Sequence, residues 1–181
     1  MVFSTLHTNS APESITRLLD MGMDPFNFAD ALLGILAQRL AKKLCGCKEA
    51  HVPSQQELKD FIKEYAHELK GTPAWKLDAG GESQHLLDEW TERYGQGGQL
   101  MFYEAIGCDK CNKTGYKGRI GLHELMIADD AAKKLIQERA RVAELFASAV
   151  NSGMRTLKMD GMEKVLMGLT DLKQVRSVCI K

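Results

Sequence analysis

Two close pairs of cysteines constrain this chain more than any other feature of its sequence. One pair lies in Cys45–Cys47 and the other in Cys108–Cys111, so each pair places two sulfurs on one tight turn. Four thiolates from two such turns form the closed, tetrahedral ligand set of a structural zinc site. The second pair has the common knuckle spacing, and Gly46 makes the tighter first turn feasible. We therefore predict a structural zinc ion held by Cys45, Cys47, Cys108 and Cys111.

Other interpretations of the cysteines remain open at this stage. They can be ordinary reduced thiols, the remnant of a lost metal site, or a redox pair, since two thiols so close together can form a disulfide. A catalytic metal site is disfavoured because neither turn offers histidine and carboxylate ligands around an open position. The fifth cysteine, Cys179, stands apart and is predicted to be a small apolar residue.

Composition excludes several classes of protein. The chain has 181 residues, enough for one or two domains, and its 24 basic residues balance its 24 acidic ones. No global charge attracts it to nucleic acid or to an anionic membrane. Its apolar runs are far shorter than the roughly 18 to 20 residues of a membrane span, and its start lacks the pattern of a secretory signal. Paired cysteines without a secretory signal indicate a reducing, cytoplasmic location.

The chain opens with an apolar segment followed by a dense polar cluster. Residues Val2–Leu6 are predicted to form a buried strand, and Ser4–Asn9 brings hydroxyls and an imidazole to its carboxyl end. Such groups can reach a phosphate, a metal-bound water or a neighbouring subunit. The alternative is that this polar stretch only caps the helix that follows, through Asn9 or Ser10.

Periodicity predicts a mixed arrangement of helices and strands. Helices are predicted after Asn9, over 26–33, from Ser54 to Leu69, and in several short pieces after Asp129, whereas 86–94 is a short segment flanked by glycines. A strand is predicted over 120–126, whereas the pattern alone over 34–44 favours a helix. Residues 48–101 form a polar excursion punctuated by glycine, which we expect to pack a small satellite core.

The motifs of an ATP-hydrolysing site are missing from these 181 residues. They contain no Gly-x-x-x-x-Gly-Lys-[Ser/Thr] loop and no apolar strand that ends in paired acids. This stretch is therefore not expected to hydrolyse ATP by itself.

Three stretches together resemble one family, the ATPases of type II secretion and type IV pilus assembly. They are Phe3–Ala11, Leu33–Leu40 and Gly115–Glu124, and the tail motifs from Gly153 to Leu172 agree in order and spacing. The resemblance covers nearly the whole chain except the excursion. Two departures are a first cysteine pair with one intervening residue and a longer gap between the pairs.

The resemblance implies an α/β fold: the C-terminal portion of a RecA-like ATPase domain with an inserted four-cysteine zinc subdomain and a C-terminal helical subdomain. The implied parts are a partial core in 1–44, the cysteine subdomain in 45–111, a return strand in 112–128 and the helical subdomain in 129–181. It also implies that the phosphate loop and the magnesium-binding acids lie upstream. Residues Gln38–Leu40 should then lie on a strand that pairs near 120–125, against the helical pattern.

The same resemblance implies roles for several residues outside the cysteine pairs. His7 matches the histidine that links nucleotide state to subunit contacts in this family. Thr5, Thr8, Arg119 and Glu124 fall in matching motifs and are assigned to the nucleotide site.

At the scale of the assembly, the resemblance implies a homo-hexamer that uses ATP and Mg²⁺ in its full-length form. Its partners would be an inner-membrane platform and cytoplasmic scaffold proteins, without nucleic acid. It would be cytoplasmic and reach the inner membrane through these partners. The rival hypothesis is a stand-alone zinc-binding interaction module.

Overall fold

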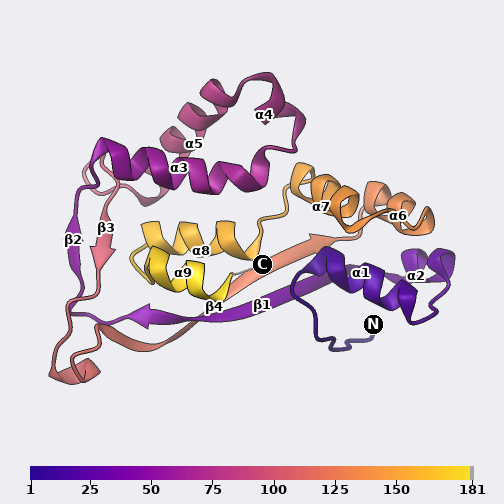
Figure 1. The fold of residues 1–181 in the computed structure, drawn as a ribbon, viewed down its shortest axis with the longest axis horizontal. Coiled ribbons are helices and arrows are strands. Elements are labelled where there is room, and N and C mark those ends of the chain that lie inside the picture. The colour runs from indigo at the N-terminus through magenta and orange to yellow at the C-terminus, as the bar shows by residue number, and fades with distance from the viewer. Residues whose placement is uncertain (180–181) are drawn as a thin grey trace. The chain divides into compact units, whose positions relative to one another are not determined.

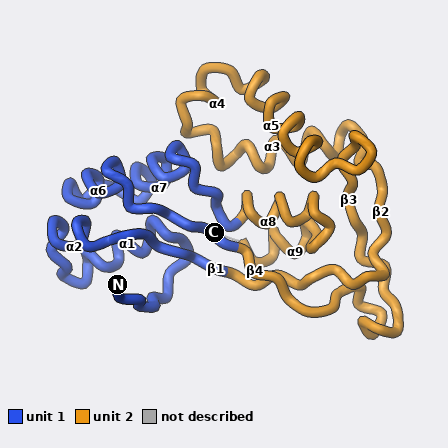
Figure 2. The backbone as a smooth tube through the Cα atoms, turned by 180° about the vertical axis from the view of Figure 1, so that it is seen from behind, with its two compact units in different colours: residues 1–38, 123–157, 181 blue, residues 39–122, 158–180 orange. Residues whose placement is uncertain are grey.

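The computed structural model of this chain describes residues 1–179 and divides them into two compact units (Figure 2). Unit 1 comprises residues 1–38 and 123–157. Unit 2 comprises residues 39–122 together with the chain from 158 to the end of the described part. The division falls inside two long strands, and the four consecutive segments expected from the sequence stay a prediction.

The two long strands form a two-stranded sheet. They are β1 (Gly34–Leu44) and β4 (Tyr116–Ile127), and their arrows point in opposite directions in Figure 1. Backbone hydrogen bonds just beyond the strands close both ends, from Ala128 N to Leu33 O (3.1 Å) and from Cys45 N to Gly115 O (2.8 Å). The strand predicted from family resemblance over Gln38–Leu40 is therefore confirmed, and the helix indicated by periodicity is wrong.

Four helices of unit 1 pack around a shared apolar core. They are α1 (Ala11–Asp20), α2 (Pro25–Ala31), α6 (Asp130–Gln137) and α7 (Val142–Asn151). Helix α6 contacts both α2 and α7, and α7 contacts α1. The core side chains are apolar and nearly inaccessible, among them Ile15, Phe28, Ile136 and Leu145. Burial of such side chains from several helices supplies the main stabilisation of a unit of this kind.

Side-chain caps fix where these helices begin. The Ser10 hydroxyl accepts from Glu13 N at 3.3 Å, and Pro12 occupies the first turn, where no intrahelical N–H is needed. The Asp129 carboxylate accepts from Ala132 N at 2.8 Å, and this hydrogen bond lowers the pKa of Asp129. The predicted helix starts near Asn9 and Asp129 are thus confirmed.

The predicted strand over Val2–Leu6 is wrong. Residues 1–8 have no regular secondary structure, and the side chains of Met1, Val2 and Phe3 are largely exposed. A strand requires a neighbouring strand to accept its backbone hydrogen bonds, and the described residues place none beside this segment.

Unit 2 combines a short β ribbon with helices from both halves of the chain. Strand β2 (Glu49–His51) pairs antiparallel with β3 (Phe102–Glu104), with Ala50 opposite Tyr103. The helices are α3 (Gln55–Leu69), α4 (Pro73–Leu77), α5 (Ala79–Tyr94), the 3-10 turn η1 (Asp109–Cys111), α8 (Leu157–Leu166) and α9 (Leu172–Val178). Helix α8 begins at Leu157, the last residue of unit 1 in that stretch.

One apolar core joins the excursion to the C-terminal helices. Trp90 of α5 packs edge-on against Phe61 and Tyr65 of α3, with ring centroids 5.6 and 4.8 Å apart. The same buried cluster includes Met159, Met162, Val165 and Leu166 of α8 and Val175 of α9. The excursion therefore shares its core with α8 and α9 and does not form a satellite core of its own.

Polar contacts tie the same elements together. Glu163 of α8 accepts hydrogen bonds from the Tyr65 hydroxyl at 2.7 Å and from the Tyr94 hydroxyl at 3.0 Å. Burial, followed by the charge of Glu163, raises the pKa of Tyr94 to about 12. Glu64 of α3 pairs with Lys158 at 2.9 Å and with Arg176 at 2.6 Å, so α3 is fastened to both C-terminal helices.

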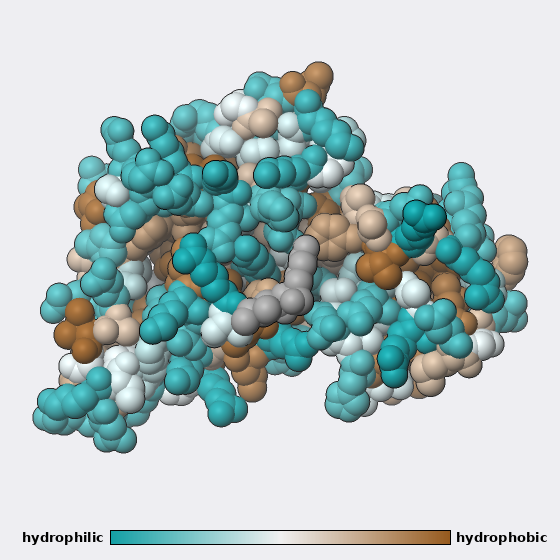
Figure 3. Space-filling model, in the orientation of Figure 1, coloured by the Kyte–Doolittle hydropathy of each residue, from teal (hydrophilic) through white to brown (hydrophobic). Residues whose placement is uncertain are grey.

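No helix among residues 1–179 is both long and apolar enough to cross a membrane. The face drawn in Figure 3 carries mostly hydrophilic side chains, with apolar ones scattered among them.

Candidate metal centre

The four paired cysteines come from the two ends of the long strands. Cys45 and Cys47 directly follow β1, whereas Cys108 caps and Cys111 ends the turn η1, which precedes β4. Because β1 and β4 are paired, the end of one strand lies beside the start of the other. The sheet therefore brings together two turns that are 60 or more residues apart in sequence.

The sulfur positions fit a tetrahedral ion. The Sγ atoms of Cys45 and Cys108 are 4.0 Å apart, those of Cys47 and Cys111 3.9 Å, and those of Cys108 and Cys111 3.8 Å. All four sulfurs lie within 4.8 Å of one another. Four ligands at about 2.3 Å from a central zinc ion would lie about 3.8 Å from each other. The donor set and its spacing thus suit a single metal ion.

Backbone N–H groups also converge on one of the sulfurs. The Cys111 sulfur accepts hydrogen bonds from Cys108 N and from Gly115 N, both at 3.2 Å. The left-handed backbone at Asn112 (φ 51°) and Lys113 (φ 61°) turns the chain so that the Gly115 N–H faces this sulfur. Donors of this kind favour the thiolate, which is the form that binds metal.

The environment shifts the pKa values of two of the thiols in opposite directions. The hydrogen bond from Cys108 N, aided by that from Gly115 N, lowers the pKa of Cys111 to about 6. Desolvation, aided by the neighbouring Cys108 sulfur, raises the pKa of Cys47 to about 12. Four thiolates this close repel one another, so without a cation the cluster keeps some thiols protonated. A divalent ion removes that repulsion and allows all four to ionise.

Two glycines beside the second cysteine pair allow this geometry. Both have positive φ, +102° at Gly107 and +78° at Gly115. A Cβ at Gly107 would lie 2.5 Å from Lys113 O, and one at Gly115 would lie 2.6 Å from the Ala105 Cβ. The signal available in the sequence was a glycine just before the second pair and another four residues after Cys111.

Two lysines near the cysteines, Lys48 and Lys113, have partners outside the sulfur cluster. Lys48 Nζ donates to Gly168 O at 2.5 Å and lies 4.4 Å from the centre of the Tyr103 ring. Lys113 Nζ pairs with Asp109 at 2.8 Å. The Lys48 contact instead links the metal centre to the end of α8. Thr170 reinforces that link by donating to Lys42 O at 2.8 Å.

The residues assigned by resemblance to the nucleotide site take no part in the four-cysteine cluster. His7 and Thr5 are exposed, and the Thr8 hydroxyl is 2.6 Å from that of Ser14. Arg119 is exposed on β4 in unit 2, whereas the other four belong to unit 1. No contact in the structure tests their roles, which stay predictions.

Glu124 is the exception, because it has a clear structural setting. Its side chain is buried, and its two oxygens accept from Ala11 N at 2.7 Å and from Leu157 N at 3.3 Å. Ala11 and Leu157 are the first residues of α1 and α8. One carboxylate thus caps two helix N-termini, where negative charge is favourable.

These observations define a mixed α/β protein with a closed cluster of four thiols close enough to hold one metal ion. The sequence matches the family described as "Type II/IV secretion system protein" over residues 1–177, and the chain belongs to this family.

Named relatives support the same assignment. The chain is 39% identical over 98% of its length to the type IV pilus assembly ATPase TfpB of Acinetobacter baylyi. It is 36% identical to the type II secretion system ATPase E of Vibrio cholerae and 37% identical to the type IV pilus assembly ATPase PilB of Pseudomonas aeruginosa, again over 98% of its length. The chain spans 26%, 29% and 26% of these three relatives, respectively.

Proposed function

We propose that this chain forms the C-terminal part of a hexameric ATPase that powers pilus or pseudopilus assembly and protein secretion at the bacterial inner membrane. The observation that carries this proposal is the family match over residues 1–177, together with relatives named as secretion and pilus assembly ATPases. ATP and Mg²⁺ would bind in the full-length protein. Neighbouring subunits, an inner-membrane platform and cytoplasmic scaffold proteins would be its partners, and it would reside in the cytoplasm.

Within that machine, the cysteine centre would bind one structural zinc ion. Cys45, Cys47, Cys108 and Cys111 would hold it, and zinc would supply a fixed tetrahedral crosslink and no reaction chemistry. The Gly115 and Cys108 N–H groups would orient the Cys111 thiolate. The ion would connect the end of β1 to the start of β4, and so close the loop that contains the excursion. Metal binding stabilises such a loop because the unfolded chain lacks a preformed site.

Metal analysis of the purified chain tests the zinc centre. Protein prepared without added metal and under reducing conditions should contain about one zinc ion per chain. Absence of metal from folded protein would leave the thiols as ordinary reduced cysteines and remove zinc from the proposal.

The motor hypothesis is tested in the full-length protein through His7. We expect His7→Ala to leave the fold intact, because the His7 side chain is exposed. If His7 couples nucleotide state to subunit contacts, the variant loses most ATP hydrolysis, measured as phosphate release. His85→Ala, a change of an exposed histidine in the excursion, serves as a control. Full activity of the His7 variant would remove this residue from the mechanism, and the 181-residue chain alone should release no phosphate.

A further inference from the structure

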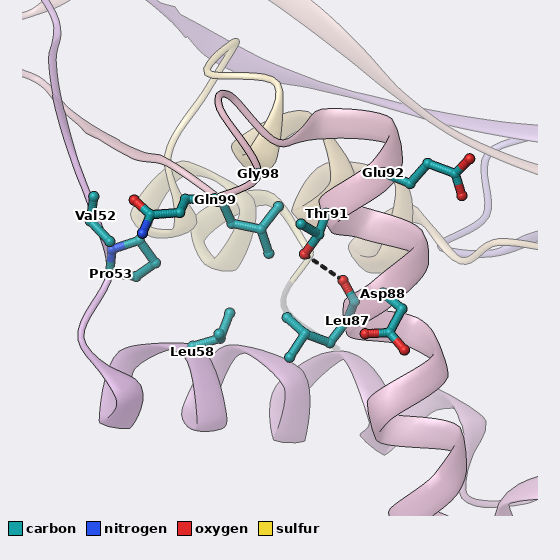
Figure 4. A pocket seen from close by; sticks show the side chains of 10 residues that line it. Val52, Pro53, Leu58, Leu87, Asp88, Thr91, Glu92, Gly98 and Gln99 are labelled. Atoms are coloured by element: carbon teal, nitrogen blue, oxygen red, sulfur yellow. Dashed lines mark hydrogen bonds between the residues drawn. The ribbon is translucent and has the colours of Figure 1, made fainter.

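The excursion contains an open groove that neither the metal centre nor the motor hypothesis explains. It lies between the segment before α3, the first turns of α3, the middle of α5 and the turn before β3 (Figure 4), and its volume is about 600 Å³. The lining residues are Val52, Pro53, Leu58, Leu87, Asp88, Thr91, Glu92, Gly98, Gln99 and Leu100. All belong to unit 2.

The floor of the groove is apolar. Leu58 and Leu87 point into it from the two helices, with Val52 and Pro53 on the side opposite α5 (Figure 4). The Thr91 hydroxyl is already used, because it donates to Leu87 O at 2.8 Å. The side chain of Val52 is 55% exposed, so apolar surface is available to a partner.

The turn that closes one side of the groove has a defined shape. Gln96 and Gln99 exchange backbone hydrogen bonds of 2.8 and 3.2 Å. Gly97 and Gly98 between them have φ of +60° and +81°, which glycine adopts without strain. This short turn holds Gln99 and Leu100 at the groove, so the site is preformed and a partner need not order it.

The rim of the groove is acidic. Asp88 and Glu92 are exposed on α5, with the Glu92 side chain extending away from the apolar floor (Figure 4), and no lysine or arginine is among the described residues that line the groove. The surrounding segment adds to this negative charge. Residues 48–104 contain eleven acidic and six basic residues, although the whole chain is neutral. An apolar floor with a rim of one charge sign selects a partner of the opposite sign.

We propose that this groove binds a short segment of a partner protein in which aliphatic side chains are flanked by lysine or arginine. The aliphatic side chains would fill the floor between Leu58 and Leu87, and the basic ones would approach Asp88 and Glu92. The acidic rim repels an anionic lipid surface or a nucleic acid. This proposal goes beyond the motor hypothesis and does not depend on it.

The test uses the metal-loaded chain and two synthetic peptides of about 14 residues with leucines at i and i+4. One peptide carries lysines around the leucines, and its twin carries glutamates at the same positions. Binding is followed by amide chemical shifts. The lysine peptide should shift Val52, Leu87, Thr91 and Gln99, and its affinity should fall between about 50 and 300 mM salt. The glutamate peptide should bind at least about tenfold more weakly.

Matched variants then localise the effect. Glu92→Lys should weaken binding of the lysine peptide about fivefold or more and flatten its salt dependence, since a rim charge acts mainly through steering. Asp60→Lys makes the same charge change on α3, and Asp60 lies about 200° around the helix from Leu58, so binding should not change. Val52→Ser removes exposed apolar contact and should weaken both peptides.

Three results would overturn the proposal. The first is equal binding of the two peptides, and the second is the absence of groove shifts at about 1 mM lysine peptide, a concentration that detects even weak binding. The third is self-association of the chain, abolished by Val52→Ser, together with no shifts on addition of the lysine peptide. In that case a second copy of the chain would occupy the groove. Loss of ATPase activity in the full-length protein would not bear on any of these outcomes.

Discussion

Cys111 has the most constrained sulfur in the molecule. It lies 3.8 and 3.9 Å from two other sulfurs and accepts two backbone hydrogen bonds. A cysteine sulfur is large and polarisable, so its thiolate can bind a metal ion beside the other sulfurs and also accept these hydrogen bonds. A serine oxygen is smaller and remains protonated at neutral pH. The geometry thus makes this position the sharpest test of the metal centre.

We expect Cys111→Ser to lose stoichiometric metal. Zinc measured by mass spectrometry should fall from about one per chain to a small fraction, because a structural site requires all four ligands. Cys179→Ser is the matched control, since Cys179 packs against the apolar core of unit 2 and is not part of the four-sulfur cluster. Unchanged zinc content in the Cys111 variant would show that the metal is held elsewhere.

The ligand set could be predicted from the sequence, but the support around it could not. Cysteine spacing reports which sulfurs can share a turn, so the four cysteines were named from the pattern alone. The N–H donors depend on left-handed backbone at Asn112 and Lys113, which no residue type there demands. The hydrogen bond from Gly115 N to the Cys111 sulfur depends on that turn, so it could not be predicted from the sequence.

Glu124→Gln should destabilise the protein by about 1–3 kcal/mol, since it leaves a buried N–H unsatisfied. The carboxylate accepts at both oxygens, from Ala11 N and Leu157 N, whereas an amide offers only one acceptor and turns a donor toward the other N–H. Urea unfolding measures the change. Glu138→Gln, an exposed change in unit 1, should stay within about 0.5 kcal/mol. Equal stability of both variants would contradict the double-cap role.

At the scale of elements, β1 shows how a sequence pattern can fit two structures. Leu36, Leu40 and Leu44 recur every four residues, which places them on one face of a helix and also on one face of a strand. Periodicity alone therefore could not decide. Pairing with β4 decides it, because the partner strand supplies the hydrogen bonds that an isolated segment would otherwise find in a helix.

The predictions of helices agree better with the structure than the pattern over β1 does, because helix caps and amphipathic faces depend on residues close in sequence. Ser54 and Glu57 form a reciprocal capping box at the start of α3, where the sequence predicts a helix from Ser54. What the sequence could not show is the destination of the apolar face. Phe61 and Tyr65 pack with α8 and α9, which lie about a hundred residues further along the chain.

The ion pairs of Glu64 on α3 with Lys158 and Arg176 form a clamp on the C-terminal helices, and this clamp predicts that stability depends on pH. The hydrogen bond from Arg176, with help from Lys158, holds the pKa of Glu64 below its usual value. A lowered pKa means that the unfolded state binds more protons in acid. The contribution of Glu64 is therefore present above its unfolded pKa, near 4.5, and is lost as pH falls further.

Glu64→Gln should accordingly flatten the loss of stability between about pH 6 and 3.5. The expected difference is about 1 kcal/mol or less, because solvent screens these partly exposed pairs. Urea unfolding at both pH values measures it, with Asp60→Asn on the same helix as the control. A Glu64 variant with the wild-type pH slope would show that the clamp contributes nothing.

At the scale of the whole molecule, unit 2 has two independent means of holding the excursion. One is the metal centre at the ends of β1 and β4, and the other is the core in which Trp90 meets α3, α8 and α9. A metal ion bound by the four cysteines would close a chain loop, whereas the core buries apolar surface, so the two should respond differently to perturbation.

Trp90→Ala separates the two contributions. Trp90 is 1% exposed and packs against Phe61 and Tyr65, so its truncation should lower the free energy of unfolding by about 3–5 kcal/mol. Because α3, α5, α8 and α9 share one core, their amides should lose exchange protection together, while metal content stays at about one per chain. Trp75→Ala is the matched control, since Trp75 is only partly buried beside the same core and should have a smaller effect. If instead α8 and α9 keep their protection while α3 and α5 lose theirs, the excursion folds as a separate body, and the shared core does not determine the stability of unit 2.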